Sequence, residues 1–520
     1  MNVMDYISTL ETKYSMPAPS QPSTRPFAKD AIHLERRTKI IATIGPASWD
    51  RGVLEQLITS GADVFRLTFS HAGEEKMTEI IATIRSASEA VGREVAILGD
   101  LPGPKLRIGA LAGDFAELEP GMHVTLTPAD VEGDRETIPV SWPGVTSLRE
   151  NELVYLADGA IRLRVSEPDS EGVDCEVEIG GTLSSHKRTN IPGGTELPAA
   201  TETDLAWTEF AAAHGVDLLA VSFVSAAADL VPVQQRLEAL GSDIPLIAKI
   251  ELPQAAQNIE EIVAQAASGI MFARGDLGIE VPLAEVPVLQ KRLIRTAGRC
   301  SKPVITATQM LASMVTAPRP TRAEVTDIAN AIYDGTDAVM LSEETAVGQH
   351  PVEAVRVMDR IARATEPDLP YGEWLFSRTD QQIQEVADSV AQSAVGAVYR
   401  LGLKAIVVPT TSGRTARIVS AHRPNVPVLA ISPRIETVRR LNLLSGVTAV
   451  LSEHETDIRG LLRRCAALAS RHRVAEPGDL VANHRRPRRP GAGHQSLRGS
   501  PGSMSEPGGE DAGRGTRSER

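Results

Sequence analysis

Cysteine is scarce in this chain, and long apolar runs are missing. The only cysteines are Cys175, Cys300 and Cys465, which lie far apart in the sequence. An odd number of distant cysteines is typical of reduced thiols in a cytoplasmic protein rather than of a disulfide framework. No run is long and apolar enough to span a membrane, and the first residues lack the basic region and apolar stretch of a secretory signal. The sequence therefore predicts a cytoplasmic protein without a membrane partner.

The charge balance narrows the possible partners further. Acidic residues outnumber basic ones, and the formal net charge is −13 over 520 residues. This surplus disfavours general binding to nucleic acid, but it leaves room for a local basic site. With 42% apolar residues the chain can fill ordinary hydrophobic cores, and its length predicts more than one domain.

From Thr38 onward, short apolar segments alternate with amphipathic stretches. Continuous apolar runs separated by helical stretches are typical of parallel strands that are buried on both faces. Eight such runs predict a (β/α)8 barrel, also called a TIM barrel. The expected strands are TKIIATIG, DVFRLTF, VAILGD, DLLAVSF, IPLIAKI, GIMFAR, PVITAT and DAVML.

The pattern changes in the middle of this barrel and again after it. Following the third run, segments such as NELVYLADGAIRLRV and DCEVEIGGTL alternate apolar and polar residues between turn signals, which predicts an inserted all-β domain. Later, LKAIVVPTTSGRTARIVSAHRPNVPVLAISP begins another pair of βα units. The expected division is a flexible arm at 1–36, the barrel at 37–109 and 188–366, the insertion at 110–187, a C-terminal α/β domain at 380–482 and a disordered tail at 483–520.

Two segments, KIELPQA and MFARGDLGIE, carry the clearest chemistry. Lys249 and Glu251 lie two residues apart at the end of an expected strand, so their side chains point to the same side. Asp276 is a second carboxylate at a strand end. Two carboxylates suit Mg2+ or Mn2+ that keeps water and substrate in its other positions, and a nearby lysine and arginine would hold an anionic substrate against the metal. For either segment alone, a chance match is the alternative.

Other strand ends carry residues suited to the same anionic substrate. Arg66 lies in an otherwise apolar strand, where a cation buried without an anion is costly. Thr308 could relay a proton or simply cap a helix, and a lone histidine such as His71 is often only a hydrogen-bonding loop residue. The remaining polar residues of this kind are Ser70, Asp100, Lys105 and Arg107.

These segments, together with PTRAEVTDIANAIYDGTDAVMLSEETAVG, resemble the pyruvate kinase family in their order and spacing. The resemblance runs from about Thr38 to about Asp479. It implies a barrel, a small β-barrel lid domain inserted after the third strand and a C-terminal α/β domain, which is also the layout that the patterning predicts. The activity that it implies is transfer of the phosphoryl group of phosphoenolpyruvate to ADP, giving pyruvate and ATP, by a homotetramer.

The resemblance also implies a role for each matching residue. Glu251 and Asp276 would bind Mg2+ or Mn2+, while Lys249 and Arg66 would neutralise the transferring phosphoryl group. Thr308 would help to protonate the enolate. The groups implied to hold the substrate carboxylate are Thr308 and the amides of Gly275 and Asp276, and those implied near the ADP phosphates are His71, Arg107 and Lys187.

One departure from the family pattern concerns K+. Most members hold K+ with an asparagine, a serine, an aspartate and a threonine carbonyl, and the matching positions here are Thr68, Ser70, Asp100 and Leu101. Where K+-dependent members commonly have glutamate, this chain has Lys105, whose ammonium can supply the charge of a bound monovalent cation. The chain thus resembles the K+-independent branch, and we expect no K+ requirement. The alternative is that Lys105 is a solvated charge at the lid hinge.

Further departures lie at the hinge and toward the C-terminus. Beside Lys187 this chain has Arg188, where glycine is common in the family. It also has Glu343, where many members have a small residue. After EPGDLVA the usual family ending is replaced, which suggests a frameshift near Asn483, either real or a sequencing error. The loop formed by Thr411, Ser412, Gly413, Arg414 and Thr415 matches part of an effector phosphate pocket in relatives, and a plain helix cap is its alternative.

Two other functions stay open at this point. Metal-dependent carbon–carbon lyases that act on phosphoenolpyruvate or pyruvate also bind an enolate on Mg2+, but they need neither a β lid nor a C-terminal α/β domain. A non-catalytic or assembly-defective pyruvate kinase homologue is the second. Such a homologue would be expected to lose some of the four residues Lys249, Glu251, Asp276 and Thr308, and all of them are present.

Overall fold

A computed structural model describes residues 36–483, except 71, 105, 158, 169–171, 192–199, 380–385, 454, 456, 473, 477–478 and 480. Two candidate site residues, His71 and Lys105, lie outside the described residues. Residues 1–35 of the expected arm and 484–520 of the expected tail also lie outside them. The latter range includes most of the segment that we attribute to a frameshift.

Within the described part of the chain, eight parallel strands close into a barrel in the order β1-β16-β15-β14-β13-β12-β3-β2. The prediction of a (β/α)8 barrel is confirmed, and each expected apolar run supplies one strand. The strands are almost entirely buried because side chains fill the barrel inside and helices cover it outside. Their bounds are β1 (Lys39–Thr43), β2 (Val64–Thr68), β3 (Ala96–Asp100), β12 (Leu218–Val221), β13 (Leu246–Ile250), β14 (Gly269–Ala273), β15 (Val304–Ala307) and β16 (Ala338–Leu341).

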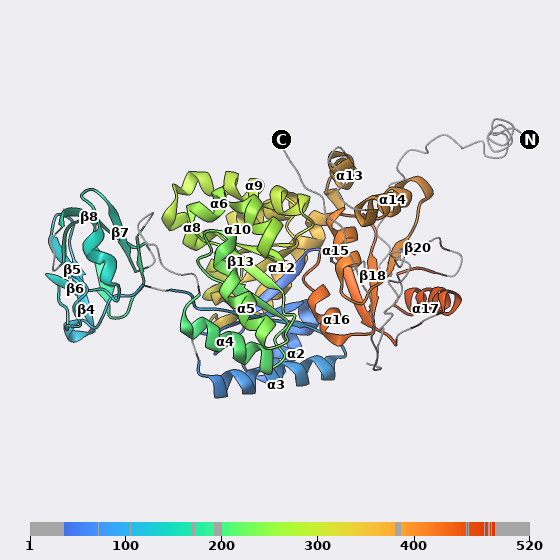
Figure 1. Cartoon of the computed structure of the whole chain (residues 1–520), viewed down its shortest axis with the longest axis horizontal. Helices are drawn as coiled ribbons and strands as arrows, with labels where there is room; N and C mark the ends of the chain where they lie inside the picture. Colours follow the sequence, from blue (N-terminus) through green and yellow to red (C-terminus); the bar gives the residue numbers. More distant parts are fainter. Residues whose placement is uncertain are drawn as a thin grey trace, which may run out of the picture. The chain divides into compact units, whose positions relative to one another are not determined.

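Helices that follow the barrel strands pack around them (Figure 1). Two of these helices begin at capping boxes, where Thr201 and Thr321 each accept a hydrogen bond from the backbone amide three residues later. The bounds are α2 (Arg51–Ser60), α3 (Glu74–Val91), α4 (Glu202–Ala213), α5 (Val231–Ala239), α6 (Pro253–Gln257), α7 (Ile259–Glu261), α8 (Arg274–Glu280), α9 (Val286–Arg299), α10 (Arg322–Tyr333), α11 (Glu343–Ala346) and α12 (Pro351–Thr365).

The insertion after β3 is the all-β domain that the alternating pattern predicts. Its described residues form a six-stranded sheet in the order β11-β7-β8-β9-β5-β6 and a two-stranded sheet of β10 and β4, around a separate apolar core. The domain that the sequence predicts as a small β-barrel is thus a curled six-stranded sheet with a separate two-stranded sheet. The strands are β4 (Phe115–Leu118), β5 (His123–Thr127), β6 (Thr137–Pro139), β7 (Leu153–Leu156), β8 (Ile161–Pro168), β9 (Val173–Ile179), β10 (Gly181–Ser184) and β11 (Thr189–Asn190).

The C-terminal part is an α/β domain, as predicted. In the described residues its parallel sheet has the order β19-β18-β17-β20, and β20 is formed by the end of the EPGDLVA segment. Its strands are β17 (Ala405–Pro409), β18 (Val428–Ser432), β19 (Val447–Leu451) and β20 (Val481–Asn483). Its helices, with the connecting α13, are α13 (Tyr371–Thr379), α14 (Val386–Leu401), α15 (Arg414–Ala421), α16 (Ile435–Leu441) and α17 (Ile458–Arg471). Among the residues described, no helix has the length and apolarity needed to cross a membrane.

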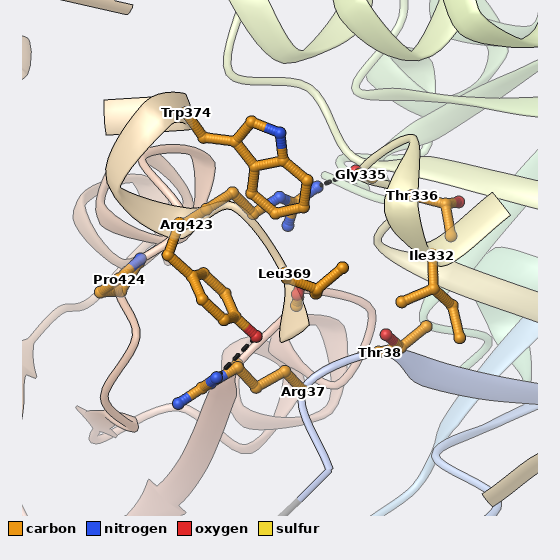
Figure 2. A pocket seen from close by; sticks show the side chains of 12 residues that line it. Arg37, Thr38, Ile332, Gly335, Thr336, Leu369, Trp374, Arg423 and Pro424 are labelled. Atoms are coloured by element: carbon orange, nitrogen blue, oxygen red, sulfur yellow. Dashed lines mark hydrogen bonds between the residues drawn. The ribbon is translucent and has the colours of Figure 1, made fainter. Parts of the chain in front are cut away.

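A small cavity lies where the barrel meets the C-terminal domain (Figure 2). On one side, Arg423 binds Asp337 with two nitrogens at 2.7 and 2.8 Å and donates to the Gly335 carbonyl at 2.6 Å. On the other side, Arg37 donates to the hydroxyl of Tyr371 at 2.6 Å. These arginines join segments that are far apart in the sequence, so they fix the C-terminal domain to the amino end of the barrel.

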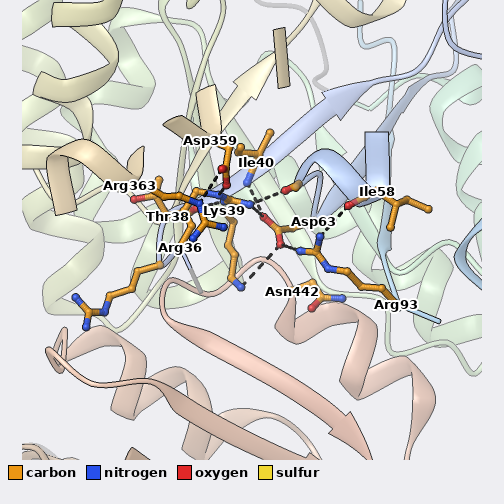
Figure 3. Close-up of polar contacts among 12 residues, drawn as sticks. Arg36, Thr38, Lys39, Ile40, Ile58, Asp63, Arg93, Asp359, Arg363 and Asn442 are labelled. Atoms are coloured by element: carbon orange, nitrogen blue, oxygen red, sulfur yellow. Dashed lines mark hydrogen bonds and ion pairs between the residues drawn. The ribbon is translucent and has the colours of Figure 1, made fainter. Parts of the chain in front are cut away.

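A buried ion network around Asp63 strengthens the same junction (Figure 3). Its carboxylate accepts from Arg36 at 2.9 Å and from Arg93 at 2.5 Å, and it lies 4.0 Å from Nζ of Lys39. Lys39 also donates to the Val447 carbonyl of the C-terminal domain at 2.8 Å. Arg36 falls within the arm that the sequence predicts to be flexible, yet it is only 6% exposed because two carboxylates and two carbonyls bind it.

Candidate active site

The candidate residues converge because parallel strands end at the same rim of the barrel. Arg66 on β2 donates from Nε to Asp100 at 2.6 Å and from NH1 to the Thr43 hydroxyl at 3.1 Å. Asp100 ends β3 and is 2% exposed, so it anchors the arginine in a shielded position. Arg66 is therefore paired with an anion, as the cost of burying a lone cation requires.

Lys249 lies at the centre of this cluster. Its Nζ is 3.2 Å from Asp100 Oδ1 and 2.9 Å from Glu251 Oε1, and it donates to the Ser222 hydroxyl at 2.7 Å. Burial alone would lower the pKa of Lys249, but the charges of Asp100 and Glu251 outweigh it and raise the pKa. The lysine is consequently a fixed positive charge at the mouth of the barrel.

Glu251 is held by the backbone of the neighbouring strand end. Its Oε2 accepts from the amide of Phe223 at 2.8 Å, and Phe223 has a left-handed backbone with a φ of +56°. Bulky residues rarely adopt that conformation, so the surrounding structure must hold it there. This bend directs an amide at Glu251 and leaves the carboxylate 2% exposed.

Asp276 is the second candidate metal ligand, on the first turn of α8 directly after β14. Arg188 donates to its Oδ1 from NH1, with side chains 15% and 21% exposed. Burial alone would raise the pKa of Asp276, but the charges of Arg188 and Lys249 outweigh it and lower the pKa. The carboxyl group is therefore ionised and already faces a cation.

The donor set fits a hard divalent cation. Glu251 and Asp276 are carboxylates brought to one rim by β13 and α8, and a guanidinium already binds the second of them. In the described residues no group of three or more His, Cys, Asp or Glu side chains could hold a metal. As two carboxylates, Glu251 and Asp276 suit an ion that takes its other ligands from substrate and water, as Mg2+ and Mn2+ do.

Thr308 follows β15 in a strained conformation. Its φ is +69°, which is costly for a β-branched residue. The hydroxyl accepts from the Gly275 amide at 2.7 Å, and Arg274 donates to the Thr308 carbonyl at 2.9 Å while its NH1 binds both oxygens of Asp327. Arg274 of the Arg-Gly-Asp sequence therefore braces this turn and keeps Thr308 beside Gly275 and Asp276.

Two of the residues expected near the nucleotide lie where the insertion joins the barrel. Arg107 is exposed, pairs with Arg188 in an isolated β-bridge and donates to the His186 carbonyl at 2.9 Å. Lys187 is exposed on the adjacent returning segment. The third candidate, His71, lies outside the described residues.

Two of the four positions that match the family's K+ ligands bind protein groups. Asp100 binds Arg66 and Lys249, and the Leu101 carbonyl accepts from the Ser222 hydroxyl at 2.8 Å. Thr68 ends β2 and Ser70 lies in the turn that follows. Lys105 lies outside the described residues.

The candidate effector loop lies in the C-terminal domain, between β17 and α15. Gly413 has a φ of +80° at the start of α15, a left-handed conformation that glycine adopts readily. Thr411 and Ser412 are exposed, whereas Arg414 and Thr415 in the first turn of the helix are partly buried. The tight turn into α15 is enough to explain the glycine at position 413. Phosphate binding by this loop stays a prediction.

Two participating residues were not expected from the sequence. Ser222 connects Lys249 to Leu101, and its position at the end of the apolar run DLLAVSF is the only signal that could have indicated it. Arg188 was noted only as a departure from the family pattern. Its contact with Asp276 depends on where the insertion returns to the barrel, which local sequence patterns do not specify.

The fold and the charged residues at its rim are typical of a (β/α)8-barrel enzyme that acts on an anionic substrate. Two family profiles match the chain, "Pyruvate kinase, barrel domain" over residues 35–355 and "Pyruvate kinase, alpha/beta domain" over residues 388–492. The chain therefore belongs to the pyruvate kinase family of phosphotransferases. Members of this family generally use Mg2+ and often K+.

Individual relatives agree with this assignment. A pyruvate kinase from Thermococcus litoralis is 45% identical over 419 residues, covering 79% of this chain and 88% of the relative. A pyruvate kinase from Methylorubrum extorquens is 42% identical over 448 residues, covering 86% and 93%. The crystal structure of a pyruvate kinase from Cryptosporidium parvum is similar with a TM-score of 0.84 and 34% identity, covering 88% of this chain and 95% of that one. The predictions of family and activity are thus confirmed.

Proposed function

We propose that this chain transfers the phosphoryl group of phosphoenolpyruvate to ADP at the cluster around Lys249, with a divalent cation and without K+. The observation that carries the proposal is the fixed ammonium of Lys249 between Asp100 and Glu251. Phosphoryl transfer depends on positioning and on neutralising charge, rather than on covalent chemistry by the protein. A buried lysine and a partly buried arginine at one rim would supply this neutralisation.

Each residue of the cluster has a part in this reaction. Glu251 and Asp276 would hold Mg2+ or Mn2+, which when bound neutralises charge on the substrate's oxygens. Lys249 and Arg66 balance negative charge on the phosphoryl group as it leaves the enolate oxygen. The hydroxyl of Thr308 accepts from the Gly275 amide and donates to the Ala307 carbonyl. It would exchange that second bond to help deliver a proton to the enolate carbon.

The insertion would serve the nucleotide side of the reaction. Arg107 and Lys187 lie at its two connections to the barrel, where their charges suit the ADP phosphates. Closing the insertion over the site would exclude water, so that the phosphoryl group passes to ADP rather than to water. We also propose that the enzyme is a homotetramer, which light scattering of the purified chain would check.

Independence from K+ is the finer part of the proposal. Both oxygens of Asp100 face protein cations, and the Leu101 carbonyl already accepts a hydrogen bond, so these groups need no further cation. Lys105 would supply the positive charge that a bound K+ supplies in K+-dependent members.

The test is pyruvate formation by the purified full chain from phosphoenolpyruvate, ADP and Mg2+. Tetramethylammonium chloride replaces KCl at equal ionic strength in one of two parallel assays. We expect similar rates with and without K+, and we expect Lys105→Glu to be slow until K+ is added. Activity that depends wholly on K+ in the unmodified chain would refute the K+ part alone. Absence of pyruvate in both salts would refute the proposed activity of the chain as it stands.

A further inference from the structure

Arg188 places a positive charge on a carboxylate that we assign to the divalent cation. Its NH1 donates to Asp276 Oδ1, and its Cζ lies 5.0 Å from the centroid of the Phe223 ring. The carboxylate and the aromatic face both favour a cation at this point. The side chain is only 15% exposed, so water screens the contact weakly.

The backbone of Arg188 belongs to the returning edge of the insertion, not to the barrel. Its carbonyl accepts from the Ala157 amide at 2.9 Å, and it faces Arg107 in an isolated bridge. The following residues form β11, which pairs with β7. Asp276, in contrast, lies on α8 of the barrel. The ion pair thus links the insertion directly to a candidate metal ligand.

Arg188 is one of several charged groups that surround Asp276. A dication that bound Glu251 and Asp276 while Arg188 stayed would face a guanidinium at close range, which is repulsive in a shielded site. Arg188 takes Oδ1 of Asp276, so an ion that binds through this oxygen could do so only after the guanidinium has left. In the described part of the chain, Arg66, Lys249 and Arg188 pair with Asp100, Glu251 and Asp276. The carboxyl group of Glu280 also interacts with Arg188 and Asp276.

We propose that Arg188 is an internal competitor of the divalent cation at Asp276. Metal ion and guanidinium exclude each other there, and the insertion edge that carries Arg188 must shift before the ion binds. An anionic substrate gives the displaced guanidinium a new partner, so that metal and substrate favour each other's binding. The inference rests on the proposed function, in which Asp276 is a metal ligand.

The test measures binding of Mn2+ alone to the purified full chain, without substrates, from the electron paramagnetic resonance signal of free Mn2+. Arg188→Gln removes the positive charge. Arg188→Lys keeps the charge but replaces the planar guanidinium group by an ammonium. Arg164→Gln is the matched control, because it removes an arginine of the insertion that pairs with Glu178 rather than with Asp276. We expect Arg188→Gln to bind Mn2+ about fivefold tighter or more, Arg188→Lys to fall between, and Arg164→Gln to match the unmodified chain.

Arg188→Gln binding no tighter than Arg164→Gln, or both binding undetectably, would overturn the inference. Asp276→Asn separates this failure from failure of the proposed function. If Asp276→Asn abolishes the binding seen in the unmodified chain or in Arg188→Gln, Asp276 is a ligand and only the competition is in question. If Asp276→Asn leaves that binding unchanged, the assignment of the metal site is wrong. Circular dichroism melting of each variant checks that it is folded.

Discussion

The ammonium of Lys249 lies 2.9 Å from Oε1 of Glu251, and the two side chains are 8% and 2% exposed. They stand two residues apart at the end of β13, so the strand itself directs both to the same side of the rim. The geometry of a single strand therefore brings the pair together. Its rigidity keeps a positive charge where an anionic substrate must arrive, at little reorganisation cost.

Lys249→Met should lower kcat by about 10²- to 10³-fold, the loss typical of removing one fixed charge that stabilises a transition state. The loss in kcat should exceed the change in KM, because Lys249 neutralises the charge of the phosphoryl group while that group is being transferred. Steady-state assays of pyruvate formation measure both. Lys302→Met is the matched control: Lys302 is a partly buried lysine next to β15 at the amino end of the barrel, and it donates to the Ala267 carbonyl. Equal losses in the two variants would argue against the assigned role.

Thr308→Ala should slow protonation of the enolate by about 10²-fold, whereas Thr308→Ser should keep most of the activity because it retains the hydroxyl. The hydroxyl accepts from the Gly275 amide at 2.7 Å, which fixes its position. Exchange of the methyl protons of pyruvate with deuterated solvent isolates this step from phosphoryl transfer. A variant that loses overall activity but exchanges normally would exclude Thr308 from the proton path.

Much of the fold could be predicted because its signals are local. Apolar runs such as those of β1 and β16 need only their own residues to indicate buried parallel strands, and the barrel follows from their number. The convergence of Lys249 and Asp276 followed in turn, because parallel strands share a carboxyl end. Arg36 illustrates what could not be predicted, since it is buried only through partners that are distant in sequence. Arg188 is similar, as its partner Asp276 lies 88 residues away.

Asp63→Asn should lower the free energy of unfolding near neutral pH. This difference from the unmodified chain should disappear in acid. Burial alone would raise the pKa of Asp63, but its three cationic partners outweigh burial and lower it from an ordinary 3.8 to about 2. A carboxyl group with a lowered folded-state pKa stabilises the fold above pH 3.8, and its contribution disappears as the pH falls toward 2. The shift corresponds to about 2 kcal/mol of stability.

Urea unfolding of Asp63→Asn and of the unmodified chain, from pH 7 down to pH 3, checks this expectation. The gap between their unfolding midpoints should be constant above about pH 5 and should narrow below about pH 4. Asp359→Asn is the control, since it removes the other carboxylate on Arg36 and leaves Asp63 in place. A gap that stays constant down to pH 3 would show that the carboxylate charge of Asp63 does not carry the effect.

Glu251→Gln should raise the Mg2+ concentration for half-maximal activity by at least about tenfold, because a neutral amide is a weaker ligand for a hard cation than a carboxylate. Gln can still accept the hydrogen bond from the Phe223 amide, so the local backbone should survive. Glu280→Gln is the matched control on α8, next to Asn190 at 3.3 Å, and it should leave the Mg2+ dependence nearly unchanged. Chelation by EDTA should abolish activity in all three proteins, with recovery on adding Mg2+. A shift for Glu251→Gln no larger than that for Glu280→Gln would contradict the assignment of Glu251 as a metal ligand.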